Sequence, residues 1–447
     1  MMRVAQSVKL RILSIEFLER EVKLRMPFRF GVATLTESPQ AFVRCRIRTE
    51  GGQEADGAAA ELLAPKWFDK DPALSNEDNY EQLRGSLRQA RERYLAHGAA
   101  TAWEHSSTAI GLVENYGPAL LDRAVLDALC RALGISFFES IRKNVVGAGV
   151  FEEMDLGAFF SSLQPSRSIA ARHTVGLVDP ITAMDHKKRV DDGLPETLEE
   201  VVARYGQRYF KLKVGGNVRA DIERLSEIAT VLDRIGEPYH VSLDGNEQYD
   251  DMQGVAELWA KMKAEPRLGR MVESILFIEQ PVKRQKALQR KIAGIDKPVI
   301  IDESDDSMDA FLRAKELGYK GVSSKTCKGL YKSLVNRGRC AAWGKGYFMT
   351  GEDLTLQAGL ALQQDLALVS LLGLTHVERN GHHYVNGMAG LPPAEQDGFH
   401  AAHPDLYERS HGAVRLKISN GNLAIASLAC AGFASAAMPD WSTMRRR

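Results

Sequence analysis

Five short apolar runs in the middle of the chain each end in a charged or polar group, and they recur at similar intervals. The runs occupy residues 209–213, 241–246, 276–281, 299–304 and 321–325. Their charged ends are 23 to 35 residues apart, and one strand with its following helix and loops takes about 30 residues. The pattern therefore predicts consecutive strands of an alternating β/α fold whose charged ends meet at one rim.

Three further apolar runs extend this pattern in both directions. Residues 168–177 are expected to form the strand before the five runs, and 347–352 and 375–378 the two strands after them. Amphipathic stretches such as 220–234 lie between the runs and predict helices. Eight β/α units in about 210 residues fit a (β/α)8 barrel, or TIM barrel, which keeps its active site at the carboxyl ends of its strands.

The residues before the predicted barrel show a different order of expected secondary structure. Residues 9–63 read as strands and turns, because 43–48 alternate apolar and charged residues as a half-buried antiparallel strand does. Residues 76–145 show apolar positions at helical spacing. Strands followed by helices predict an α+β unit. We therefore expect an N-terminal α+β domain at 1–145 and the barrel at 146–395.

The last part of the chain is predicted to leave the barrel. Residues 414–428 alternate like an antiparallel hairpin around a turn at Asn420 and Gly421. We expect this hairpin, within a C-terminal segment at 396–447, to return to the N-terminal domain.

Composition and charge limit the kinds of binding partner and the cellular location that we expect for this protein. Lys and Arg together number 58, as do Asp and Glu, so the balanced charge gives no electrostatic reason to expect nucleic acid or an anionic membrane. Five scattered cysteines without a Cys-x-x-Cys pair argue against a disulfide framework. The N-terminus lacks the apolar stretch of a signal peptide, and no run reaches the roughly 18 apolar residues of a membrane span. A soluble cytoplasmic protein is expected.

Three carboxylates follow apolar runs at the predicted rim, namely Asp244, Glu279 and Asp302. Taken singly, each would suit a helix cap or a loop. Taken together they would repel one another unless a cation neutralised them, and oxygen-only donors suit a hard cation, Mg²⁺ before Mn²⁺. Asn246 lies on the strand face of Asp244 and is a candidate to orient a ligand or a metal-bound water, and Glu303 is a candidate partner of a lysine.

Lysines flank these carboxylates on two predicted strands. Lys211 and Lys213 are two residues apart and point to the same face, and Lys325 ends the strand across the barrel from them. A lysine near another ammonium group and a divalent cation has a lowered pKa, so it can take a proton from carbon at neutral pH. The carbon acid expected is a metal-bound carboxylate that passes through an enediolate. Lys328 is the local rival of Lys325, but it falls in an expected loop.

These residues together resemble the enolase superfamily, specifically its muconate-lactonizing-enzyme-like subgroup. Lys211-Leu212-Lys213 is similar to the superfamily's Lys-x-Lys motif, and Lys325 is similar to its opposite acid/base lysine. A lysine base acting with Mg²⁺ is a known pairing in this superfamily. The resemblance implies that Lys213 and Lys325 are acid/base catalysts, that Lys211 supports Lys213, and that the metal ligands are Asp244, Glu279 and Asp302.

The resemblance also implies the architecture and a covering loop. It implies an α/β fold in which an α+β capping domain sits on a modified (β/α)8 TIM barrel. Residues 27–31 look like the superfamily's mobile specificity loop, which makes Phe28 and Arg29 candidate substrate contacts. Members of this superfamily suggest a homo-oligomer.

Departures from the family pattern bear on the reaction. The His-Asp pair of the mandelate-racemase-like subgroup is not evident, and Glu352 stands where many members have a strand-seven acid. Dipeptide epimerases similar to this chain carry Asp-x-Asp on strand eight. This chain has Glu378-Arg379-Asn380 there, which argues against that activity. His382 and His383 follow, and they are candidates for substrate binding, although a loop histidine is more commonly solvated.

Three functions remain open on these grounds. Two opposed lysines favour Mg²⁺-dependent racemisation or epimerisation of a small-molecule carboxylate through its α-proton. A dehydratase or a cycloisomerase of the same superfamily is the alternative within this chemistry. A ligand-binding barrel without turnover is the alternative of another kind, because a fold does not by itself fix a function.

Overall fold

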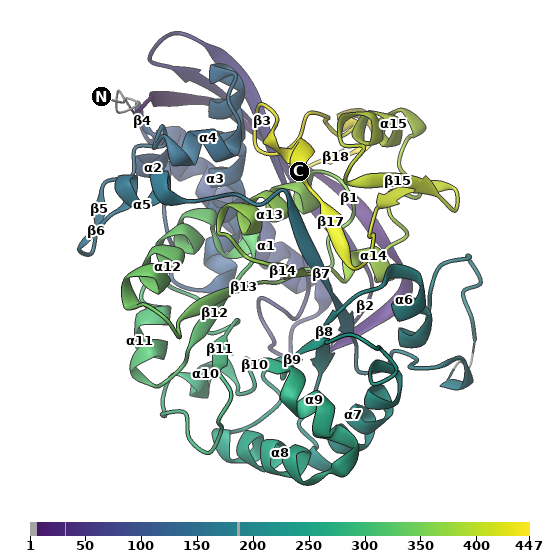
Figure 1. Ribbon diagram of the computed structural model, residues 1–447. Coiled ribbons are helices and arrows are strands. Elements are labelled where there is room, and N and C mark those ends of the chain that lie inside the picture. The colour runs from purple at the N-terminus through teal and green to yellow at the C-terminus, as the bar shows by residue number, and fades with distance from the viewer. Residues whose placement is uncertain (1–6, 32, 186–187) are drawn as a thin grey trace.

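The computed structural model describes residues 7–31, 33–185 and 188–447. Figure 1 shows an antiparallel sheet and helices from the start of the chain, in purple and blue, beside a barrel coloured from teal to green. The two parts correspond to the α+β capping domain and the (β/α)8 barrel that the sequence predicted, so the α/β fold class is confirmed. The exact boundaries at 145/146 and 395/396 stay a prediction.

The N-terminal sheet is built from long antiparallel strands. Its order is β18-β1-β2-β3, and β4 also pairs with β1. Within the second strand Cys45 and Ile47 are buried while Arg46 and Arg48 are exposed, which is the period-two pattern that the sequence predicted. The strands are β1 (Lys9–Phe30), β2 (Ala33–Thr49), β3 (Glu54–Leu62), β4 (Ala100–Thr101) and β18 (Arg445–Arg446).

Two long helices pack beside this sheet. α1 (Asn76–Ala96) starts at a capping box formed by Ser75 and Asp78. α3 (Leu112–Leu133) lies directly on β3, where a Cβ at Gly57 would come within 2.2 Å of the Ala128 nitrogen. This close approach requires glycine at position 57. The region also holds α2 (Ala102–His105), α4 (Phe137–Arg142), α5 (Leu156–Ser162), β5 (Val150–Phe151) and β6 (Met154–Asp155).

The second sheet closes into a parallel eight-stranded barrel. β7 to β14 pair in sequence order, and β14 pairs back with β7. Each of the eight strands that the apolar runs predicted is present. They are β7 (Ser168–Val175), β8 (Tyr209–Lys213), β9 (His240–Asp244), β10 (Ile275–Glu279), β11 (Val299–Ile301), β12 (Gly321–Ser324), β13 (Phe348–Gly351) and β14 (His376–Glu378).

Helices follow the barrel strands and cover the outside of the barrel (Figure 1). The first of them starts at a Thr197–Glu200 capping box and ends at Gly206 in the left-handed conformation. The longer helices are α6 (Leu198–Tyr205), α7 (Val218–Leu232), α8 (Met252–Ala264), α12 (Leu330–Trp343), α13 (Leu360–Leu371) and α15 (Pro393–Ala402). The shorter ones are α9 (Gly269–Ser274), α10 (Arg284–Ala287), α11 (Ala310–Glu316) and α14 (Gly381–Tyr384). The described residues also form five 3-10 turns: η1 (Ala183–Asp185), η2 (Pro266–Leu268), η3 (Thr326–Lys328), η4 (Ala426–Ala429) and η5 (Trp441–Thr443).

The C-terminal strands pair differently from the prediction. β16 (Ala413–Leu416) pairs with β15 (Tyr407–Ser410), while β17 (Asn422–Ala424) pairs antiparallel with β7 of the barrel. The predicted turn at Asn420 and Gly421 is present, since Ser419 and Asn422 form an antiparallel bridge across it. The predicted pairing of the two arms over 414–428 is wrong, because each arm finds a longer ladder elsewhere. The end of the chain does reach the N-terminal sheet, where β18 pairs with β1.

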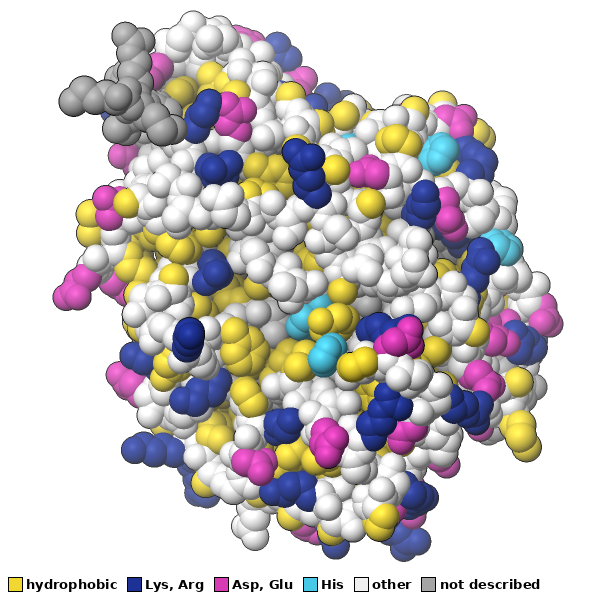
Figure 2. All heavy atoms as spheres, in the orientation of Figure 1, with side chains coloured by type: hydrophobic (Ala, Val, Ile, Leu, Met, Phe, Trp, Pro, Cys, Tyr) yellow, Lys and Arg dark blue, Asp and Glu magenta, His cyan; other side chains and the backbone are white. Residues whose placement is uncertain are grey.

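The described helices and the face shown in Figure 2 give no sign of a membrane span or of a large field of one charge. Among the residues that the structure describes, no helix is long and apolar enough to cross a bilayer. On the face shown in Figure 2, basic and acidic side chains are interspersed. This distribution agrees with the balanced composition.

Candidate active site

The three predicted metal ligands end neighbouring strands of the barrel. Asp244 is the last residue of β9 and Glu279 the last of β10, and the two are paired in register. Asp302 directly follows β11. All three side chains are buried. The parallel strands thus bring them to one rim, as the spacing of the apolar runs predicted.

Lys211 lies at the centre of this acidic group. Its Nζ is 2.9 Å from Asp244 Oδ2 and 3.0 Å from Glu279 Oε1. It also lies 2.7 Å from Glu352 Oε2 and 3.1 Å from Glu378 Oε2. Burial opposes the charge on Lys211, but the four carboxylates raise its pKa well above that of an ordinary lysine. Lys211 is therefore a fixed ammonium group that holds four carboxylates together.

The other two lysines approach from opposite sides. Lys213, the last residue of β8, donates to Asp244 Oδ2 at 2.6 Å. Lys325 directly follows β12 and donates to Asp302 Oδ2. Because β8 and β12 are four strands apart in a closed sheet of eight, these two lysines face the barrel mouth from opposite walls.

The pKa of Lys325 differs from the sequence-based prediction. Burial opposes its charge, but the Asp302 carboxylate and, more weakly, Glu279 and Glu303 raise the pKa of Lys325 above the ordinary lysine value. The predicted lowering assumed a divalent cation beside Lys325 and stays a prediction, because the direct ion pair with Asp302 sets the pKa in this structure. The Trp67 ring lies 4.6 Å from Lys325 Nζ and covers it.

Lys328 lies behind Asp302 and not in the mouth. Its Nζ is 3.2 Å from the Asp302 carbonyl oxygen and 3.3 Å from Asp302 Oδ1. It also donates to Ser323 Oγ at 2.9 Å. Lys328 is in the 3-10 turn η3, which agrees with the loop that the sequence predicted, and its contacts fix the orientation of Asp302.

The chemistry of the donor set fits a hard cation. Within residues 7–31, 33–185 and 188–447, no group of three His, Cys, Asp or Glu side chains is already arranged to hold a metal ion, since the carboxylates are paired with lysines. Burial and then Glu352 raise the pKa of Glu279 well above its ordinary value. Glu279 Oε2 also receives no hydrogen bond from the described residues, although Lys211 Nζ lies 2.9 Å away. Mg²⁺ binds carboxylate oxygens, and a buried carboxylate oxygen that lacks a cationic or hydrogen-bonding partner is a suitable ligand for it.

Glu303 and Asn246 meet a lysine of the capping domain. Lys70 Nζ lies 3.1 Å from Glu303 Oε1 and 2.9 Å from the Asn246 carbonyl oxygen. Asn246 Nδ2 is 3.4 Å from the same Glu303 oxygen. Glu303 thus contacts a lysine, but one from another part of the chain. No local pattern around Lys70 could have marked it.

Arg172 is a second residue that sequence reasoning missed. It lies on β7, is fully buried, and its guanidinium donates to Glu352 and, at 2.9 Å, to the Gly351 carbonyl oxygen. Its Nη1 is 2.7 Å from His376 Nδ1. Arg172 therefore connects the strand-seven acid to a histidine at the start of β14. The only sequence signal for Arg172 was its position within a predicted strand. The pattern of residues did not show whether its side chain would point into the barrel or outward.

The histidines after β14 lie outside the barrel interior. His383 is buried, and its ring centroid is 4.9 Å from that of His173 on β7. Because the neighbour Arg172 points into the barrel, His173 points outward. Burial lowers the pKa of His382 to about 4. The solvated-loop interpretation was wrong for His383, and neither histidine lines the cavity that covers the strand ends.

The cavity over the strand ends is small. Its volume is about 30 Å³, and its lining includes Lys211, Lys213, Asp244, Asn246, Lys325 and Glu378. Phe28 lines it as well, stacked on Tyr384 with ring centroids 4.2 Å apart. Arg29 is exposed and is not part of the lining. This volume is close to that of one water molecule, so a substrate enters only when the covering residues move.

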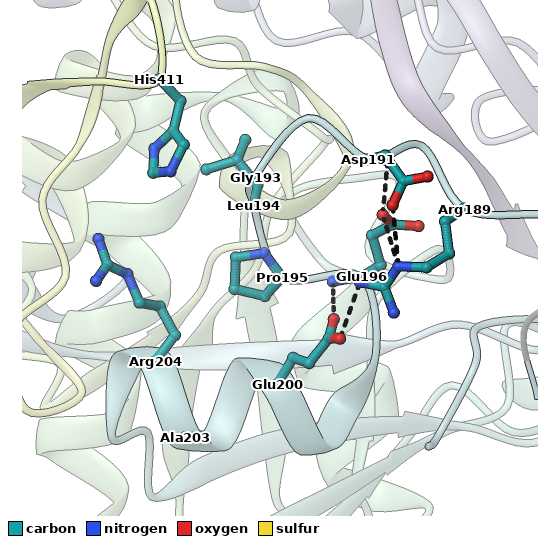
Figure 3. A pocket seen from close by; sticks show the side chains of 10 residues that line it. All are labelled: Arg189, Asp191, Gly193, Leu194, Pro195, Glu196, Glu200, Ala203, Arg204 and His411. Carbon is teal, nitrogen blue, oxygen red and sulfur yellow. Dashed lines mark hydrogen bonds and ion pairs between the residues drawn. The ribbon is translucent and has the colours of Figure 1, made fainter. Parts of the chain in front are cut away.

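A second hollow lies away from the strand ends. Figure 3 shows Arg204 and His411 on one side of it and the Arg189, Asp191 and Glu200 side chains on the other. Arg189 pairs with both Asp191 and Glu200. The charged groups on that side are thus paired with one another, and this hollow lies away from the lysines and carboxylates of the barrel mouth.

Comparison with known proteins agrees with this geometry. A family model described as "Enolase C-terminal domain-like" matches residues 193–424, which is more than half of the chain. Chloromuconate cycloisomerase from Pseudomonas putida is 31% identical over 132 residues, which is 29% of this chain and 33% of that protein. The aligned stretch thus spans a third of that relative's length.

Solved structures share the fold over nearly the whole chain. A dipeptide epimerase from Enterococcus faecalis V583, complexed with Mg and the dipeptide L-Leu-L-Tyr, has a TM-score of 0.59 at 14% identity, with 92% of this chain and 99% of that chain covered. A member of the enolase superfamily from Roseovarius nubinhibens ISM, complexed with magnesium, has a TM-score of 0.59 at 17% identity, with 98% of each chain covered.

The fold and the family match define the class of protein as a (β/α)8-barrel member of a known enzyme superfamily. The chain belongs to the enolase superfamily, in its mandelate racemase/muconate lactonizing enzyme group.

Proposed function

We propose that the protein removes the α-proton of a small-molecule carboxylate with the help of Mg²⁺, and that the outcome is racemisation or epimerisation. One observation carries this proposal. A single cavity is lined by both Lys213 and Lys325, which come from strands on opposite sides of the barrel. A planar carbon acid between them is accessible to a base on each face.

The chain's own residues divide the work. Asp244, Glu279 and Asp302 are the residues that would hold Mg²⁺, and the ion, when bound, stabilises the charge that develops on the substrate carboxylate. Lys211 keeps the ring of carboxylates in place. One of the two mouth lysines, as a neutral amine, takes the α-proton, and the other, as an ammonium group, returns a proton to the opposite face.

The proton balance requires the mouth lysines to change partners. Lys213 is bound to Asp244 and Lys325 to Asp302, and an ammonium group held by a carboxylate is a poor base. When the two aspartates ligate a cation, each lysine loses its counter-ion and its neutral form becomes accessible. The metal requirement and the base function are therefore linked through the same two aspartates.

The test is exchange of the α-proton in D₂O. With two bases, Lys213→Ala and Lys325→Ala each abolish racemisation, yet each variant still exchanges the α-proton of the one enantiomer that faces the remaining lysine. Lys320→Ala, an exposed residue at the start of β12, is the matched control and keeps full activity. Racemisation at the wild-type rate in either mouth-lysine variant would refute the two-base assignment.

Cycloisomerisation or dehydration is the second candidate, and the similarity to chloromuconate cycloisomerase supports it. In that case only one lysine acts on the α-carbon. Loss of a β-substituent, or ring closure, would replace inversion as the product observed by NMR. Exchange of the α-proton by the wild type, without inversion at the α-carbon, would favour cycloisomerisation or dehydration over racemisation.

A ligand-binding barrel without turnover is the candidate of another kind. It predicts no Mg²⁺ requirement, whereas the proposed enzyme gains thermal stability as Mg²⁺ binds its folded state. Metal analysis of the purified protein and a thermal shift with added Mg²⁺ separate the two.

A further inference from the structure

The cavity over the strand ends has an apolar wall that comes mostly from the capping domain. β1 and β2 contribute aromatic and aliphatic side chains, the segment after β3 contributes two, and one follows β13. They are Phe28, Phe30, Leu35, Ala64, Trp67 and Leu354. All six are buried. A substrate that enters must therefore place an uncharged, apolar group against this wall.

The wall is anchored rigidly beside the base. The Trp67 ring lies 4.6 Å from Lys325 Nζ. Arg284 donates to the carbonyl oxygens of Trp67 and Phe68 at 2.9 and 2.8 Å, and Glu247 holds Arg284 at 2.8 Å. The barrel thus fixes the backbone that presents Trp67, and the apolar surface begins directly at the reacting centre.

The cations of the lining are already engaged. Among the described lining residues the cationic ones are Lys211, Lys213 and Lys325, and there is no arginine. Lys211 contacts four carboxylates, and the proposed function commits Lys213 and Lys325, once they leave the aspartates, to proton transfer at the α-carbon. A second carboxylate or a phosphate on the substrate would find no partner here, and burying an unpaired anion is costly.

The anions of the lining are also engaged. Asp353 accepts hydrogen bonds from the backbone nitrogens of Asn380 and Gly381, each at 2.9 Å. Glu378 accepts from Lys211 at 3.1 Å and from the Asp353 nitrogen at 3.0 Å. A substrate ammonium group would therefore meet carboxylates whose oxygens are occupied.

Two neutral acceptors remain. Asn246 Oδ1 and Asn380 Oδ1 belong to the lining, are buried, and have no hydrogen-bond partner in the part of the chain that the structure describes. Buried polar atoms without a partner are uncommon. An uncharged O–H or N–H group near the reacting carbon would satisfy them.

We propose that the substrate is a monocarboxylate with an apolar, aryl or branched alkyl, side chain and an uncharged hydrogen-bond donor near its α-carbon. Dicarboxylates, acid sugars and free amino acids are excluded from this class. The inference rests on the proposed function for the position of the reacting carboxylate. Beyond the proposed function, it specifies the chemical character of the part of the substrate that does not react.

Four probes test the proposal by calorimetry on the full chain with Mg²⁺. 3-Phenyllactate has every feature required. Phenylalanine differs from it by an α-ammonium group, malate by a second carboxylate in place of the ring, and gluconate by a polyol chain. We expect 3-phenyllactate to bind at least about tenfold more tightly than malate and gluconate, since burying a phenyl group is worth that much or more. We expect the same margin over phenylalanine, because its ammonium group would be buried against carboxylates whose oxygens are occupied. Equal or weaker binding, including no measurable binding, overturns the proposal.

Two variants locate the preference. Trp67→Ala should weaken 3-phenyllactate binding about tenfold while malate binding changes less than about twofold. Trp441→Ala is the matched control, because Trp441 lies in η5, packs on Phe42 and is outside the cavity. Asn380→Asp should shift the ratio of 3-phenyllactate to phenylalanine binding by about tenfold toward the ammonium compound. Circular dichroism confirms that each variant is folded. If neither ratio moves in folded variants, the assignment of this wall is wrong.

Failure of this inference is distinct from failure of the proposed function. α-Proton exchange with an acid sugar or a dicarboxylate would keep the proposed reaction and overturn the substrate class. Selective binding of 3-phenyllactate without any exchange would keep the substrate class and overturn the reaction.

Discussion

Glu352 in the barrel and Asp122 in the capping domain are both hidden from water, with exposures of 1% and 6%, yet their pKa values move in opposite directions. Burial works against the charge of Glu352, but Arg172 and Lys211 lower its pKa far below the ordinary value. Burial raises the pKa of Asp122 to about 7, because its close partners are the neutral hydroxyl groups of Tyr94 and Ser106 at 2.6 and 2.7 Å.

The difference shows what each region is built to do. The barrel places cations against Glu352, so this acid stays ionised, whereas the candidate metal ligand Glu279 is short of positive charge and has a raised pKa. The capping domain satisfies Asp122 with hydrogen bonds only, which is enough to fix a loop against a helix but does not stabilise a charge. A buried acid is thus a functional candidate when its partners are cations that could be exchanged.

The largest effect is expected from Glu279→Gln. Loss of this ligand oxygen should reduce turnover by about 10²–10³-fold and remove the thermal stabilisation by Mg²⁺. Without Mg²⁺ the variant should unfold at the same or a higher temperature, because glutamine removes a buried charge that Glu352 repels. Thermal melts with and without Mg²⁺ measure both effects, and Glu81→Gln on exposed α1 is the control. A variant that keeps its Mg²⁺ response would remove Glu279 from the metal site.

Arg172→Gln tests whether cations keep the barrel acids ionised. It leaves Glu352 with one cation fewer and His376 without its donor, so we expect a loss of about 3–5 kcal/mol in the free energy of unfolding. Urea titration measures this loss. Arg172→Lys retains the charge and should recover part of it, whereas Arg208→Gln at the start of β8 should change little. Equal stability of the Gln variant and the wild type would contradict the comparison.

Asp122→Asn tests the opposite region. Because the pKa of Asp122 is about 7 in the folded state and near 3.8 when unfolded, the folded state binds more protons between these values, and stability falls as pH rises toward 7. The loss attributable to this group is on the order of 3 kcal/mol between pH 4.5 and 7. The Asn variant should lack this decline in urea titrations at several pH values. Asp56→Asn, at an exposed site, should leave the wild-type slope intact.

Lys70→Ala is expected to have the smallest effect of the four. It removes the lysine that lies 3.1 Å from buried Glu303 and should cost about 1–2 kcal/mol. Adding Glu303→Gln should cancel only part of that loss, because the pair of Lys70 with Glu247 at 2.5 Å is lost in either background. A double-mutant cycle by urea titration gives the coupling energy. Strictly additive effects would mean that Lys70 does not serve Glu303.

Much of the site could be predicted from the sequence because it depends on one short-range rule. Side chains at the ends of parallel strands share a rim, so the spacing of the apolar runs is enough to place Lys213, Asp244, Glu279 and Lys325 together. The β7 to β14 strands were predictable for the same reason. The strand partners of the C-terminal arms were not, because β17 pairs with β7, a strand far away in the sequence, and β16 with β15.

The residues that the sequence missed all act over long separations. Lys70 reaches Glu303 across 233 positions, and Arg172 reaches Glu352 across 180. No local pattern encodes such a pair, since it depends on how two domains or two distant strands pack. The raised pKa of Lys325 belongs to the same class, because it follows from a contact with Asp302 and not from residue type.

The sequence by itself determined the barrel, its charged rim and the family, because strand periodicity and the order of lysines and carboxylates are written along the chain. Only the tertiary structure decided which acids are held by cations, which wall covers the mouth, and that this wall is apolar. Those properties arise where side chains from distant segments exclude water together, and the free energy of a buried charge depends on neighbours that the order of residues does not name.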